Sequence, residues 1–477
     1  MTARKPNIVF FIADQLRHSA LGCYGNMVVK TPNIDGIAAE GVVMEQAFSS
    51  CPICSPYRGQ LLSGQYAHQN GVICNEYKLR TDIPTLPECL KKAGYSTAYI
   101  GKWHLGYGPY PEEKRYGFDY MAAYNIDDDK STSCVPYFEN DEGPKAMSDW
   151  EPVEEANMTI HYLENHIKMS PERPLFLVVS CIPPHWPYEF CPEEYQIYNP
   201  EDIQVPPNVP KAMEEFEKKE LALYYANVTG VDTQFGRIVN KLNELGMRDN
   251  TIVCFTSDHG DHIGAHGYGK PGDLWLHHTK RASKATPYEE SVHIPFVMRY
   301  PDKISGGNRS SILFNSVDVM PSLLAMCGID IPDSVTGNDL SHAFTGQKGA
   351  DPDSVFFQIL GQGWPARGPW VGYWRGIRTD RYVYARWWKK EMPSLLFDIQ
   401  KDPYELENLY YNQAYTDIRE RMENRLQQWL RDTNDPFDYG KRDPKTGILL
   451  LGQEYLELAE YDVLKSGGGI SIYEEGR

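Results

Sequence analysis

Four short apolar segments stand out from the mixed hydrophobic and polar pattern of the chain. They cover residues 8–13, 98–100, 175–179 and 252–255, and hardly any polar residue interrupts them. Strands that are apolar on both faces are typical of a parallel sheet covered by helices on both sides. We therefore predict that these segments are strands of one such sheet.

A helical pattern lies between the last two segments. Apolar residues recur at three- and four-residue spacing over 228–245, and Gly246 follows as a C-terminal cap. Strands that alternate with helices indicate an α/β fold.

Polar residues that could bind a ligand or take part in catalysis follow each predicted strand. They are Asp14 and Gln15, Lys102 and His104, His185, and Asp258 and His259. Taken singly, each has an ordinary explanation, such as a helix cap, a packed loop histidine or a solvated lysine. Ligands of open α/β sheets bind outside the carboxyl ends of the strands, so the fourfold repetition predicts one shared site.

The composition is that of a large globular protein. The chain has 477 residues, of which 41% are hydrophobic and 23% charged. This suits two domains, or one large domain with a smaller satellite. The net charge of −18 argues against a nucleic-acid partner, although a local basic pocket can still bind an anion.

The N-terminal segment bears on localisation. Its apolar run is short and lacks a small-residue cleavage site, so we interpret it as a strand and not as a signal peptide. No stretch approaches the roughly eighteen apolar residues that suggest a membrane span. The ten scattered cysteines do not form a disulfide framework, and we expect reduced thiols in the cytoplasm. A chain trimmed of an export signal would look the same.

The stretch CPICSPYRGQLLSG, residues 51–64, contains two cysteines three positions apart. A zinc site would need a second pair of ligands at metal spacing, which Cys74 and Cys89 do not provide. A redox disulfide between Cys51 and Cys54 would need a thioredoxin-sized unit. Neither explanation fits the chain.

Local helix signals suggest another role for this stretch. Ser55 can cap a helix and Pro56 fits its first turn. Cys54 would then lie at a helix N-terminus, where the backbone favours an anion, and Arg58 could face the same spot one turn later.

These residues carry a family resemblance. Residues 54–64, CSPYRGQLLSG, resemble the C-x-P-x-R signature of type I sulfatases, whose cysteine is oxidised to formylglycine after translation. Similar segments run in the family's order along most of the chain: PNIVFFIADQ, TPNIDGIAAEGVVMEQAF, GKWHLG, PPHWP, TSDHG, SKATPYEESVHIPFV, RGIRTDRYVY and LFDIQKDPYELENL.

The resemblance implies an alkaline phosphatase-like α/β fold, with a mostly parallel sheet sandwiched by helices. We expect a catalytic domain over residues 1–350. A smaller C-terminal α+β subdomain over 351–477 should contain a short antiparallel sheet, a helix and a tail.

The resemblance also implies a site for one divalent metal, with Asp14, Gln15, Cys54, Asp258 and His259 as ligands. Some members have a second aspartate in place of Gln15, and many have asparagine in place of His259. Calcium is the ion we expect. Magnesium and manganese are kept as alternatives, since the imidazole of His259 suits softer metals than calcium.

The implied reaction is hydrolysis of a sulfate ester, and the enzyme is expected to be a sulfuric ester hydrolase. Arg58, Lys102 and Lys284 would neutralise the sulfate while a hydrate oxygen of the formylglycine attacks sulfur. His185 or Lys284 would protonate the departing alcohol. His104 would then take a proton from the second hydroxyl, which expels sulfate and restores the aldehyde.

Analogy with the family suggests a small sulfated carbohydrate as the substrate. The alternatives are an aryl or choline sulfatase, a phosphonate monoester or phosphodiester hydrolase on the same scaffold, and a binding protein without activity. A formylglycine-generating or radical maturase is the expected transient partner. The tail segment GILLLGQEYLELAEY, residues 447–461, could pair subunits of a homo-oligomer.

Several residues near these motifs keep two interpretations. His266 and Lys270 either touch substrate or lie in a solvated loop. Trp364, Trp387 and Trp388 either stack on a sugar or pack in the core.

Overall fold

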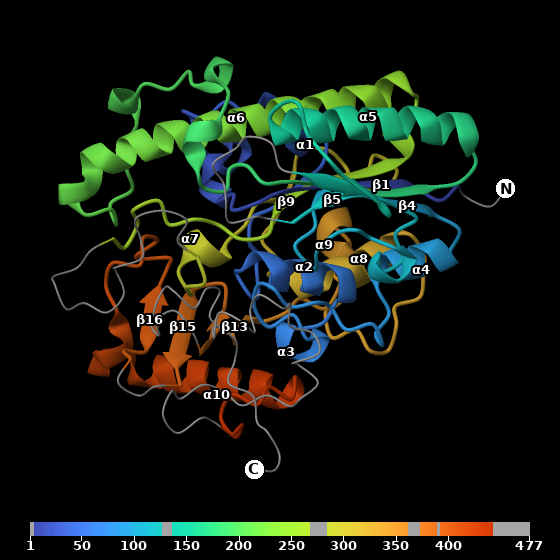
Figure 1. The fold of residues 1–477 in the computed structure, drawn as a ribbon. Coiled ribbons are helices and arrows are strands. Elements are labelled where there is room, and N and C mark those ends of the chain that lie inside the picture. The colour runs from blue at the N-terminus through green and yellow to red at the C-terminus, as the bar shows by residue number, and fades with distance from the viewer. Residues whose placement is uncertain (1–3, 126–135, 268–283, 361–372, 389–391, 442–477) are drawn as a thin grey trace, which may run out of the picture.

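The computed structural model describes residues 4–125, 136–267, 284–360, 373–388 and 392–441. Within these residues the main sheet has ten strands (Figure 1). In spatial order they are β11 (Asn308–Ser310), β2 (Val42–Met44), β10 (Phe296–Arg299), β9 (Thr251–Ser257), β1 (Asn7–Ala13), β8 (Leu175–Cys181), β4 (Ser96–Lys102), β5 (Tyr120–Tyr124), β6 (Tyr137–Glu139) and β7 (Glu142–Lys145).

The four predicted strands form the centre of this sheet as β1, β4, β8 and β9. The neighbouring strands from β9 to β5 are all parallel. Strands β10, β6 and β7 join antiparallel toward the two edges. The prediction of a mostly parallel sheet is confirmed.

Alternate residues of β1 enter two separate hydrophobic layers. Ile8, Phe10 and Ile12 pack on one side of the sheet. The intervening residues, including Val9 and Phe11, pack on the other. All seven residues of β1 are buried, which explains why its sequence is apolar after Asn7.

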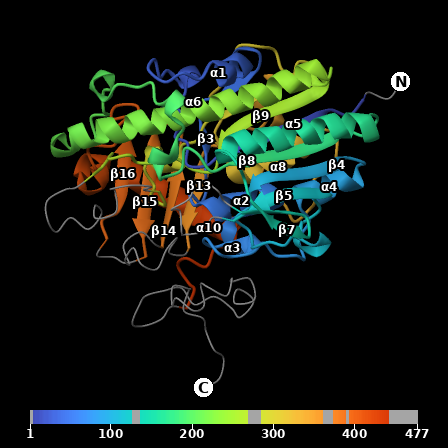
Figure 2. The same cartoon turned by 45° about the horizontal axis from the view of Figure 1, so that its top comes forward.

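Helices cover both faces of the sheet (Figures 1 and 2). One face carries α1 (Pro32–Ala39), α5 (Glu151–Met169) and α6 (Glu214–Glu244). The other carries α2 (Cys54–Ser63), α3 (Ala67–Asn70), α4 (Leu86–Lys92), α8 (Val319–Met326) and α9 (Ser341–Thr345).

The predicted helix over 228–245 is the C-terminal part of α6. Gly246 follows its end in a left-handed conformation, with φ 65°. The helix begins fourteen residues earlier than expected, because Leu221, Tyr224 and Tyr225 extend its buried face.

A second, antiparallel sheet follows in the C-terminal part of the chain. Its strands are β13 (Val355–Ile359), β14 (Trp374–Arg378), β15 (Tyr382–Trp387) and β16 (Leu395–Asp398), and α10 (Thr416–Asp432) packs against it. Small paired elements complete the fold: β3 (Ala47–Phe48), β12 (Phe314–Asn315) and α7 (Glu289–Val292).

The predicted C-terminal subdomain with sheet and helix is confirmed, while its boundary at residue 350 stays a prediction. The tail segment 447–461 lies outside the described residues. Among the described helices, none combines the length and apolarity needed to cross a membrane.

Candidate active site

Cys54 is the first residue of α2 and lies at the carboxyl-end edge of the central strands. The preceding Ile53 has extended backbone angles and serves as the N-cap, so the predicted cap at Ser55 is wrong. Ser55 lies inside the first turn, and its hydroxyl donates to the carbonyl of His104 over 2.6 Å. Every residue of α2 is buried, which fixes Cys54 rigidly in place.

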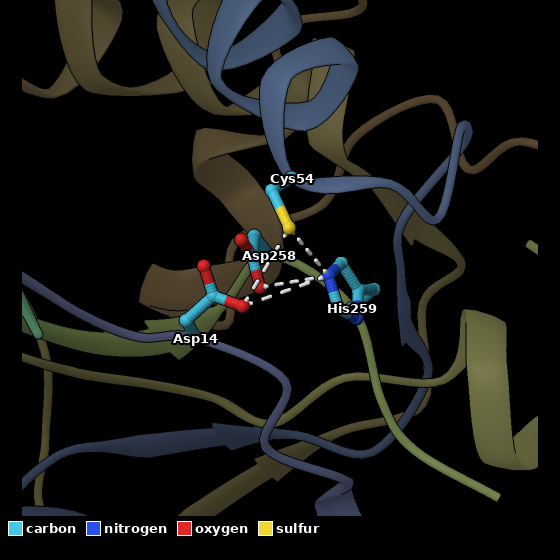
Figure 3. A group of neighbouring side chains, drawn as sticks. All are labelled: Asp14, Cys54, Asp258 and His259. Carbon is cyan, nitrogen blue, oxygen red and sulfur yellow. Dashed lines mark hydrogen bonds and ion pairs between the residues drawn. The ribbon is translucent and has the colours of Figure 1, made fainter. Parts of the chain in front are cut away.

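The ends of β1 and β9 bring three further side chains to Cys54 (Figure 3). The Cys54 Sγ atom lies 3.2 Å from His259 Nε2 and 3.7 Å from Asp14 Oδ1. Asp258 Oδ1 lies 3.6 Å from the same histidine nitrogen. These residues offer one ligand atom each within 4.8 Å of one another, a spacing that can hold a metal ion.

The two aspartates are crowded and fully buried. Burial raises the pKa of Asp258 to about 6, and the neighbouring charge of Asp14 adds to this rise. Burial opposes ionisation of Asp14 as well, but nearby cations, Lys102 first among them, hold its pKa below the ordinary value. Two buried carboxylates this close repel each other when both are ionised, and a cation bound between them would stabilise their charges.

Gln15 adds an amide to this cluster. Its backbone has a positive φ of 63°, an uncommon conformation for a residue other than glycine. Its Nε2 donates to Asp261 Oδ2 over 2.5 Å, and its Oε1 accepts from Lys284 Nζ over 3.1 Å. Asp261 therefore decides which end of the amide faces the site.

Two lysines approach Cys54, one from the end of a strand and one from a loop. Lys102 is the last residue of β4, and its Nζ pairs with Asp14 Oδ2. Lys284 Nζ donates to Cys54 Sγ over 3.1 Å. Burial opposes ionisation of the Cys54 thiol, but Lys102, Lys284 and His259 outweigh it and hold its pKa well below the ordinary value.

The neighbouring Cys51 has a different environment. It is fully buried as a thiol, and burial raises its pKa. The protein thus distinguishes one activated cysteine from an inert one three residues away.

Arg58 follows Cys54 one turn later in α2 and contacts both carboxylates. Its Nη2 lies 3.2 Å from Asp14 Oδ2 and 3.5 Å from Asp258 Oδ2. Its Nη1 donates to Tyr99 Oη, to Ser180 Oγ and to the carbonyl of Lys102 at 2.7–2.8 Å. The guanidinium therefore locks the ends of β1, β4, β8 and β9 to α2.

Two histidines flank the cluster. His185 accepts from Lys284 Nζ at Nε2 over 3.0 Å, and its Nδ1 donates to the carbonyl of Trp186 over 2.6 Å. His104 lies beyond Ser55, with a backbone φ of 56°. The ring of His104 lies close enough to Cys54 to help lower the pKa of the thiol, so the predicted site residues surround Cys54, while their catalytic roles stay predictions.

Sequence reasoning missed Asp261 and Glu76. Asp261 belongs to the stretch TSDHGDH, so a second acidic residue after the strand was a visible signal. Glu76, which lies 3.4 Å from His104, follows no strand and gave no signal.

The structure describes some of the residues that the sequence left with two interpretations. His266 stacks on Tyr288 and pairs with Glu290 over 3.2 Å, so it is packed and not solvated, while contact with substrate stays a prediction. Trp387 is buried and packs near Trp374 in the core. Lys270 and Trp364 lie outside the described residues.

Known proteins resemble the chain over nearly its whole length. The profile of the sulfatase family matches residues 6–329, and that of the N-sulphoglucosamine sulphohydrolase C-terminal region matches residues 280–432. An ulvan-active sulfatase of Formosa agariphila is 36% identical over 91% of this chain and 82% of its own. An endo-4-O-sulfatase of Bacteroides thetaiotaomicron is 31% identical over 91% and 94%.

A solved structure agrees with these relatives. It comes from Bacteroides thetaiotaomicron, is described in connection with the metabolism of multiple glycosaminoglycans, and is 30% identical. It matches with a TM-score of 0.79 over 91% of this chain and 98% of its own. The chain therefore belongs to the sulfatase family, the sulfuric ester hydrolases of the alkaline phosphatase-like superfamily.

Proposed function

We propose that this sulfatase removes sulfate from a sulfated carbohydrate, with a nucleophile derived from Cys54 and one divalent metal. The observation that carries the proposal is the meeting of Lys102 and Lys284 with the two aspartates around Cys54. An anionic ester repels a nucleophile until cations neutralise it, and these lysines provide that charge in a buried place. Relatives that act on ulvan or are named as endo-4-O-sulfatase support a carbohydrate substrate.

The donor set fits a metal ion that prefers oxygen. Asp14 and Asp258 offer carboxylates, and Gln15 offers an amide oxygen once it is released from Lys284. Such a set suits calcium, with magnesium and manganese as alternatives, while His259 is the softer ligand. When bound, the ion supplies positive charge that polarises the sulfate group.

The thiol of Cys54 fits this ion poorly, because sulfur is a soft ligand and calcium prefers oxygen. Oxidation of Cys54 to formylglycine removes the mismatch, since the hydrated aldehyde supplies an oxygen nucleophile. A maturase would have to act before folding is complete, because Cys54 is only 1% exposed in the folded chain.

The chain's own residues can hold the sulfate and move protons. Lys102 and Lys284 bind its oxygens from two sides. Lys284 is hydrogen-bonded to His185 Nε2, so the pair can share the proton that the departing alcohol takes up. His104 removes the hydroxyl proton whose loss lets sulfate leave with the electron pair of its ester bond.

A substrate panel tests this proposal. Purified protein carrying the modified Cys54 is supplied with calcium and offered sulfated mono- and disaccharides, an aryl sulfate, choline sulfate and a matched phosphodiester. We expect the highest kcat/KM on a sugar sulfate. The phosphodiester as the best substrate would favour the rival hydrolase.

A further inference from the structure

His104 is held in an unusual position. Its backbone φ of 56° is uncommon for a residue with a side chain, so the surrounding structure must hold it in this conformation. Its carbonyl accepts from the Ser55 hydroxyl over 2.6 Å, which ties it to the first turn of α2. The ring is 5% exposed and therefore largely shielded from water.

The two ring nitrogens of His104 have different surroundings. Nε2 lies 3.4 Å from Glu76 Oε1. Nδ1 is buried and has no hydrogen-bond partner among the described residues, while the ring lies close enough to Cys54 to help lower the pKa of its thiol. A neutral imidazole in this setting carries its proton on Nε2, toward the carboxylate, and keeps the lone pair of Nδ1 free.

Glu76 is itself fixed. Its backbone also has a positive φ, of 67°, and Tyr107 Oη donates to its Oε2 over 2.9 Å. Burial opposes its ionisation, but His104, Tyr107 and Lys102 hold its pKa below the ordinary value. A negative charge therefore stays beside His104 across the neutral range.

We propose that Glu76 is the positioning residue of His104, holding the ring so that Nδ1 faces residue 54 as a proton acceptor. Enzymes commonly activate a nucleophile with a neighbouring base, and a third group, often a carboxylate, orients that base. The distance of 3.4 Å is long for a hydrogen bond, as catalytic contacts often are before substrate binds. The inference rests on the proposed function, because it assigns His104 the proton of the sulfate-releasing step.

Kinetics of Glu76→Gln test this role. The substitution keeps the shape and removes the charge, and Asp82→Asn is the matched control, because Asp82 forms an exposed pair with Arg80 in the same region of the chain. We expect Glu76→Gln to lower kcat about 10–100-fold, the loss found for carboxylate partners of metal-binding histidines, with KM little changed. Because sulfate release is the affected step, the first turnover should release the alcohol in a burst.

A second readout does not need activity. Nitrogen-15 NMR of the histidine rings, with His104 identified by its own substitution, reports the tautomer in protein whose Cys54 is unmodified. We expect Nε2 to be protonated in the wild type, and Glu76→Leu, which removes the acceptor, to give a mixture of tautomers.

The outcomes separate the inference from the proposed function. A raised KM with unchanged kcat would make Glu76 a substrate-binding residue, and kinetics equal to those of Asp82→Asn would make it a surface charge. Either result, or an Nδ1-protonated ring in the wild type, overturns the inference. A wild type that hydrolyses no sulfate ester overturns the proposed function, while the NMR result still decides the pairing.

Discussion

Lys284 offers the sharpest test of how the site neutralises its substrate. Its Nζ lies 3.0–3.1 Å from His185 Nε2, Gln15 Oε1 and Cys54 Sγ, so one ammonium serves three groups. Lys284→Met removes the charge while keeping most of the side-chain volume.

The magnitude follows from these distances. Two unit charges 3.1 Å apart interact by about 5 kcal/mol at an effective dielectric constant of about 20. Lys102 and the metal remain in the variant, so this figure is an upper bound. Loss of a comparable donor to a developing anion costs about 10²–10³ in rate, and we expect the same loss in kcat/KM on sulfate esters.

The assay compares kcat/KM of wild type, Lys284→Met and Lys401→Met on one sugar sulfate and one aryl sulfate. Lys401 is an exposed lysine near Asp398, so it controls for the change in net charge. Thermal melting of all three proteins checks the fold. A loss below tenfold on both substrates, in a folded Lys284→Met protein, would refute the charge argument.

Three further predictions concern other groups. Burial raises the pKa of Glu155 from 4.5 to about 8, so the native state keeps a proton that the unfolded chain loses between these values. Stability should therefore fall as pH rises through this window, by at most about 1.4 kcal/mol per unit, and Glu155→Gln should remove that slope in urea titrations at about pH 5 and 7.5. His185→Ala should slow sugar sulfates more than an aryl sulfate, because a poor leaving group needs the proton more; equal losses in kcat/KM would make His185 a binding residue. Chelation should abolish activity and added calcium restore it, while Asp258→Ala should lose metal binding by calorimetry and remain folded; undiminished binding would place the metal elsewhere.

Much of the central architecture could be predicted because its signals are local. The four core strands are buried on both faces, so each contains an apolar run, and the polar residues after them had to meet at one edge. The edge strands β6 and β7 escaped prediction because they are exposed or half-buried and carry no apolar pattern.

The site was harder to predict where contacts between residues far apart in the sequence determine which groups a side chain binds. The side chain of Ser55 is a good helix cap in isolation, but in the structure its hydroxyl donates a hydrogen bond to the carbonyl of His104. Asp261 contacts Gln15 and Glu76 contacts His104, and both partners are far away in the sequence. Such contacts follow from tertiary packing, so even the visible acidic residue Asp261 could not be assigned its partner from the sequence.

The state of residue 54 tests the central claim most directly. Peptide mass spectrometry measures the fraction of Cys54 converted to formylglycine in preparations made with different amounts of maturase, and sulfate release from the best sugar sulfate is measured on the same samples. The account predicts activity proportional to that fraction, with Cys51 an intact thiol throughout. Full activity in protein whose Cys54 is unmodified would contradict it.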